Sequence, residues 1–162
     1  MKRLITRGSM LLAAAALATS GLAIIGVAPA GAVTQPGKCT KLTTKQSGSN
    51  ILATVSGCTP TSATGGKGSG TFKAGQTSGS LAASLKWATN HGTTKASVKL
   101  SPQATRGKCP AGTTRIKVTG SVTGGTGAAG RLFKKGQPVS GSVCANTATG
   151  NASLEPGTAL KF

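Results

Sequence analysis

The chain has 162 residues, in which 19 Lys and Arg side chains stand against a single carboxylate side chain, Glu155, for a formal net charge of +18. One carboxylate excludes catalysis by a carboxylate pair, and with only one His the chain has too few ligands for a catalytic metal. The length suits one domain and leaves no room for a second core.

Residues 1–32 have the pattern of a secretory signal peptide. Three basic residues lie within the first seven positions, an uncharged and largely apolar run follows, and A-x-A cleavage signals lie within 28–32. An uncleaved membrane anchor is the alternative, because about 20 apolar residues can span a bilayer. The cleavage signals favour removal, so we expect residues 33–162 to form one secreted domain without a transmembrane segment.

Four cysteines remain in that domain: Cys39, Cys58, Cys109 and Cys144. An even number in an exported chain indicates disulfide bonds. Of the three possible pairings we predict the nearest-neighbour one, Cys39 with Cys58 and Cys109 with Cys144, each contributing about 3 kcal/mol by the chain-entropy model. A zinc site is the alternative, but the sequence has no CxxC pair and a single His.

The predicted secondary structure consists of strands, because apolar and polar residues alternate along several segments. In chain order these are NILATVSG, GTFKAG, SLAASLKWA, TKASVKLS, TTRIKVTGSV, VSGSV and the closing TALKF. Glycine-rich turns separate them, and no segment after the signal peptide has helical periodicity. This spacing predicts an all-β fold: an antiparallel β-sandwich or barrel of about seven or eight strands, held by two disulfides.

The only Trp and the only His of the chain, Trp87 and His91, fall at one predicted hairpin. Trp87 ends a row of alternate residues that share the inner face of the predicted strand, so we expect it in the core near a sheet end. Asn90-His91-Gly92 suits a turn, and we expect His91 to be an exposed turn residue rather than part of a ligand site. The expected core comprises the large apolar residues of inward parity: Leu42, Ile51, Val55, Phe72, Leu81, Leu85, Trp87, Val98, Leu100, Ile116, Val118, Val143, Leu160 and Phe162.

Few residues are equipped for catalysis. A Ser–His–acid arrangement of His91, Glu155 and a serine is formally possible, but no G-x-S-x-G elbow supports it, and nothing singles out a Ser–Lys pair. The stretch GGTGAAG at 124–130 has the glycine content of a phosphate loop without GK[ST] or a following helix, so we expect a turn or flexible loop. We expect no enzymatic activity, no cofactor and no metal.

Positive charge is the strongest remaining signal. On three successive predicted strands, basic residues occupy the alternate positions that face outward, and the RLFKKG segment could extend this basic surface. The residues are Lys86, Lys95, Lys99, Arg115, Lys117, Arg131, Lys134 and Lys135. Such a surface attracts polyanions by counterion release, whereas the alternative is a solvated surface that only maintains solubility. Too few aromatic residues face outward to stack on bases, so we expect no sequence-specific nucleic-acid binding. The expected partners are anionic cell-envelope polymers or an anionic lipid surface, where Phe133 is either a membrane-contacting tip or a core residue.

Several stretches together resemble small secreted β-rich proteins of actinobacteria, which largely lack an assigned function. These are the signal peptide, Gly57-Cys58, 68–87, 90–92 and 117–130. The resemblance implies secretion and an all-β fold and transfers no functional residue. We therefore predict a secreted, non-enzymatic basic β-domain that associates with anionic envelope material. The alternative is a disulfide-stapled protease inhibitor, because CPAGTTRIKV begins like one and would offer Arg115 to a trypsin-like enzyme; the sequence leaves the oligomeric state open.

Overall fold

The computed structural model describes residues 37–73 and 78–162, and the signal peptide predicted over 1–32 lies outside them. The elements of this part are β1 Lys38–Ser47, β2 Asn50–Thr59, α2 Thr61–Thr64, β3 Lys67–Lys73, β4 Gly79–Trp87, β5 Thr93–Pro102, β6 Thr114–Thr126, α3 Gly127–Leu132, β7 Pro138–Asn146, β8 Asn151–Leu154 and β9 Leu160–Lys161. The all-β prediction is confirmed.

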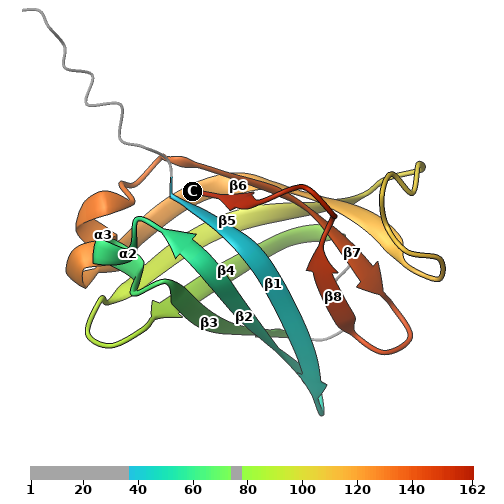
Figure 1. Cartoon of the computed structure of the whole chain (residues 1–162), viewed down its shortest axis with the longest axis horizontal. Coiled ribbons are helices and arrows are strands. Elements are labelled where there is room, and N and C mark those ends of the chain that lie inside the picture. The colour runs from blue at the N-terminus through green and yellow to red at the C-terminus, as the bar shows by residue number, and fades with distance from the viewer. Residues whose placement is uncertain (1–36, 74–77) are drawn as a thin grey trace, which may run out of the picture. The chain divides into compact units, whose positions relative to one another are not determined.

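The strands close into an eight-stranded antiparallel β-barrel (Figure 1). Each strand from β1 to β8 pairs with the next one in the chain, and β8 returns to β1 at Thr43 and Ser153. β8 has only four residues, so it does not cover the length of its neighbours. β9 occupies the rest of that place in the wall, pairing with β1 at Lys38 and Cys39 and with β7 at Ser140.

The alternation read from the sequence corresponds to the two faces of the barrel wall. On β5, Thr94, Ala96 and Val98 are buried inside, whereas Lys95 and the other residues between them are exposed. Side chains of adjacent residues in a strand point to opposite faces, so a wall with one dry and one wet face requires a period of two.

One end of the barrel is capped. Figure 1 shows α2 and α3 at this end, and the β1–β2 and β7–β8 hairpin turns at the opposite end. Beneath the helices, Trp87 packs against Phe133 and Phe162, with ring centroids 5.4 to 5.7 Å apart. All three side chains are at most 3% exposed. Phe133 is therefore a core residue rather than an exposed tip.

The hairpin that carries Trp87 and His91 has the predicted form. Thr89 and Asn90 have positive φ angles of 33° and 61°, and Gly92 one of 88°, so the chain reverses between β4 and β5. The Trp87 indole N–H donates a hydrogen bond of 2.8 Å to the Thr94 hydroxyl. His91 is half-buried instead of fully exposed, because its ring lies against Gly65 beside α2.

Two sequence-based expectations need correction. The 124–130 stretch is no flexible loop: β6 continues to Thr126, and α3 begins at Gly127. The alternation does not reveal α2 or α3 because they have only four and six residues. Small residues let α3 pack closely on the sheet, since a Cβ atom on Gly130 would collide with Gly125.

The predicted disulfide pairing is confirmed. Cys39–Cys58 joins β1 to β2 near the capped end, and Cys109–Cys144 ties the β5–β6 loop to β7. No free cysteine is found in the described part of the chain.

Candidate functional site

The barrel interior is only partly filled. A cavity of about 190 Å³ lies between the strands, and its lining is mostly apolar, with six polar members: Thr44, Thr71, Ser84, Thr94, Asn146 and Thr147. Six side chains expected in the core line this cavity and are half-buried rather than buried: Leu42, Phe72, Leu81, Leu85, Leu100 and Leu160. They point inward as predicted, but they meet an open space instead of a facing side chain.

The base of the cavity is the aromatic cap. Phe162 and Thr94 line the cavity there, and Trp87 lies behind them in the cluster. The Thr94 hydroxyl already accepts the hydrogen bond from Trp87. No buried side-chain nitrogen or oxygen in residues 37–73 and 78–162 lacks a hydrogen-bond partner. The deep part of the cavity therefore presents mainly apolar surface, and its polar side-chain atoms already have a hydrogen-bond partner.

At two junctions between adjacent strands, here called seams, the barrel wall has few backbone pairings, and the contacts at the two seams differ. Between β1 and β8 the Thr44 side chain joins the strands: its hydroxyl accepts a bond from the Ala152 N–H and donates one to the Gly150 carbonyl. Between β3 and β4 the described residues pair only at Gly68–Trp87 and Ser69–Lys86, although both strands continue. A side chain closes the first seam, whereas the described residues of the second have no pairing beyond Ser69–Lys86.

The predicted polyanion-binding residues occupy outward positions. Lys86, Lys95, Lys99 and Lys117 are exposed on β4, β5 and β6, which are neighbouring strands. Arg131, Lys134 and Lys135 are exposed at the capped end, in α3 and the loop after it. Further exposed lysines lie on β1 and β3: Lys38, Lys41, Lys45, Lys67 and Lys73. Positive charge thus extends around much of the barrel instead of marking one sheet face.

Arg115 differs from the other predicted residues because it is engaged. Its Nε donates to a Glu155 carboxylate oxygen at 2.8 Å and to the Ser142 hydroxyl at 3.2 Å. It also lies within β6, paired with Cys144 of β7, whereas a substrate-like inhibitor loop would present it on a protruding segment.

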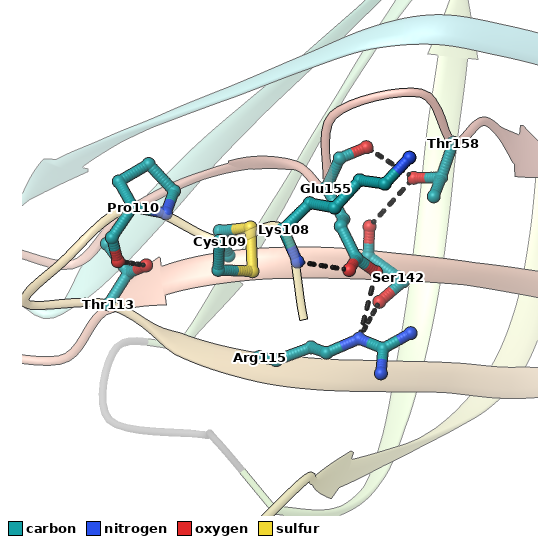
Figure 2. The surroundings of a disulfide bond; sticks show 9 residues. Lys108, Cys109, Pro110, Thr113, Arg115, Ser142, Glu155 and Thr158 are labelled. Carbon is teal, nitrogen blue, oxygen red and sulfur yellow. Dashed lines mark hydrogen bonds and ion pairs between the residues drawn. A yellow bond between two sulfur atoms is a disulfide. The ribbon is translucent and has the colours of Figure 1, made fainter. Parts of the chain in front are cut away.

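Glu155 is the centre of a polar cluster beside the Cys109–Cys144 disulfide (Figure 2). The Lys108 backbone N–H donates to its carboxylate at 2.9 Å. The Lys108 N–H, the Ser142 hydroxyl and Arg115 together hold the pKa of Glu155 below its ordinary value, because each favours the charged carboxylate. Glu155 therefore has a structural role between the β5–β6 loop and the barrel wall.

The remaining candidates for chemistry are not assembled. His91 lies against Gly65, whereas the Glu155 carboxylate is held by Lys108 and Arg115. Among the described residues, no three His, Cys, Asp or Glu side chains are grouped as a metal site would require. The apolar cavity has the form of a small-molecule binding site.

The two helices of the described part are both far too short to cross a membrane. The two intramolecular disulfides are typical of extracellular proteins. No protein-family model, curated protein or solved structure matches the chain. The resemblance to secreted actinobacterial proteins therefore stays a prediction.

Proposed function

We propose that this protein is an exported, non-enzymatic binding protein that holds a small apolar ligand inside its barrel. The observation that carries the proposal is the ring of half-buried leucines around a hollow of about 190 Å³. Apolar surface left in contact with solvent costs about 25 cal/mol per Å². A ligand that covers these side chains recovers that free energy without any rearrangement of the wall.

The size and lining of the cavity restrict the ligand class. An aliphatic cavity of about 150 Å³ accommodates benzene, whereas sites for drug-sized molecules begin at about 300 Å³. A cavity of about 190 Å³ therefore suits a single ring or a short alkyl chain. Because the deep polar groups are already hydrogen-bonded, the buried part of the ligand carries no polar group.

The test is binding of 1-octanol, followed by calorimetry and by chemical-shift changes of the cavity methyl groups. Ala83 of β4 lines the cavity, whereas Ser97 of β5 is exposed on the outer face and is paired with strands on both sides. Ala83→Phe fills the hollow and should lower the affinity at least about tenfold, whereas the control Ser97→Phe should bind like the unaltered protein. Absence of octanol binding up to about its solubility limit, or equal loss in both variants, would overturn the proposal.

A second candidate function is association with anionic cell-envelope polymers or an anionic lipid surface. It is supported by the exposed lysines around the barrel, together with the engagement of Glu155 by Arg115, which leaves no free carboxylate side chain in the described residues. Retention on anionic vesicles or cell-wall preparations should fall steeply with salt. Retention that salt does not change, or none at low salt, would refute it.

A further inference from the structure

The open seam between β3 and β4 connects the cavity to the outer surface. In a regular barrel wall only alternate residues face inward, and apart from this seam the cavity has consecutive lining residues only where β7 ends, at Ala145, Asn146 and Thr147. At this seam consecutive residues of both strands line the cavity: Gly70, Thr71 and Phe72 of β3, and Ala83, Ser84 and Leu85 of β4. Residues of outward parity reach the cavity because the two strands separate beyond the Ser69–Lys86 pair.

The strands begin to part at Gly70. A Cβ atom at this position would lie 2.5 Å from the Ser84 carbonyl oxygen, so glycine is required for the last close approach. Past this point, β3 runs to Lys73 and β4 starts at Gly79, and no pairing joins these described segments. The result is a slot with Ser84 at its inner end.

Cations border this slot on the outer face. Ser84 is exposed, lines the cavity and stands directly opposite Lys95 in the β4–β5 register. Cβ atoms of such cross-strand neighbours are about 5 Å apart. Lys86 follows Ser84 on the same face of β4, since residues two apart share a face. The chain's single carboxylate side chain, Glu155, is bound to Arg115 and does not neutralise either lysine.

We propose that the ligand is an anionic amphiphile: an alkyl chain or ring that enters the barrel between β3 and β4, with an acidic head group that stays outside near Lys86 and Lys95. This inference rests on the proposed ligand binding and names the chemical class. The cavity accepts the apolar part, because its deep surface is mainly apolar and its buried polar atoms already have hydrogen-bond partners. The lysines attract the head group at the solvent boundary, where the pairing is screened by salt.

The test compares four probes with one alkyl chain: octanoate, octyl phosphate, 1-octanol and octylammonium. At low salt the two anions should bind about three- to tenfold more tightly than octanol, as expected for two exposed ion pairs, and octylammonium should bind least. Octanoate and octyl phosphate distinguish a carboxylate head from a phosphate head. High salt should remove the advantage of the anions and leave octanol binding unchanged.

Two double variants with equal charge loss locate the effect. Lys86→Gln with Lys95→Gln should abolish the advantage of the anions, whereas the control pair Lys134→Gln with Lys135→Gln, at the capped end, should retain it. Neither pair should change octanol affinity. If octanol binds but the anions bind no better, or if both variants lose the advantage equally, the head-group site is refuted while ligand binding stands. If none of the four probes binds, the proposed function fails as well.

Discussion

The hydrogen bond between Trp87 and Thr94 gives a direct test of how the cap is held together. Thr94→Val keeps the shape of the side chain and removes the acceptor of the indole N–H, which is 2.8 Å away in a buried setting. A buried donor left without a partner costs about 1–3 kcal/mol. We therefore expect the free energy of unfolding to fall by about 2 kcal/mol, a substantial part of the margin of a small domain.

The assay is urea unfolding followed by the fluorescence of Trp87, the only tryptophan of the chain. A second measurement by circular dichroism includes Trp87→Phe, which has no indole donor. In that background Thr94→Val removes only the acceptor of a bond that is already lost, so its cost should drop by about 1 kcal/mol or more.

Two results would refute this reasoning. Thr94→Val that unfolds at the same urea concentration as the unaltered protein would mean that the bond contributes nothing to stability. An equal cost of Thr94→Val with Trp87 and with Phe at that position would mean that the two side chains act independently.

Three further predictions concern the cross-links and the wall. The disulfides close loops with sequence separations of 19 and 35 residues, and the chain-entropy model gives them stabilisations of about 3 and about 4 kcal/mol. Reduction should therefore unfold the domain. A reduced protein with an unchanged melting temperature would contradict this. Because the pKa of Glu155 is lowered in the fold, its contribution is present above its unfolded pKa and lost as the pH falls through the folded value. The urea midpoint should thus fall on acidification more in the unaltered protein than in Glu155→Gln, and parallel pH profiles would refute the role of this carboxylate. Gly120→Ala places a Cβ atom against the Ser97 carbonyl of the neighbouring strand and should lower the free energy of unfolding by about 1–3 kcal/mol. The control Ser121→Ala should change it by no more than about 0.5 kcal/mol. Equal melting temperatures of the two variants would show that the wall can adjust at this point.

Much of the wall could be predicted from the sequence because its pattern is local. A period of two along β4, β5 and β6 reveals which residues face inward, and that assignment needs no knowledge of the neighbouring strands. β1 was not among the predicted strands, since Leu42 is the one large aliphatic residue on its inner face. Its place depends on contacts distant in sequence, such as the Thr44 hydroxyl bonds to Gly150 and Ala152.

The cavity could not be predicted because parity gives the direction of a side chain and not the distance to the opposite wall. In a sandwich, two sheets about 10 Å apart would bury Leu81 and Leu100 against facing residues. In an eight-stranded barrel the same inward residues surround a central space whose filling depends on their sizes. The engagement of Arg115 by Glu155 is equally invisible in sequence, since the two lie 40 residues apart.

The incomplete filling follows from composition once the barrel is known. The chain has three Phe, one Trp and no Tyr, and Trp87, Phe133 and Phe162 all pack at the capped end. The rest of the interior is left to Phe72 and to aliphatic side chains, which do not fill the space across the barrel. The Cys109–Cys144 disulfide and the Glu155 cluster tie the wall together from outside, whereas buried core residues such as Val98, Ile116 and Val118 line the hollow itself. A ligand in the cavity therefore adds contacts to the core and displaces none of the bonds that tie the wall from outside.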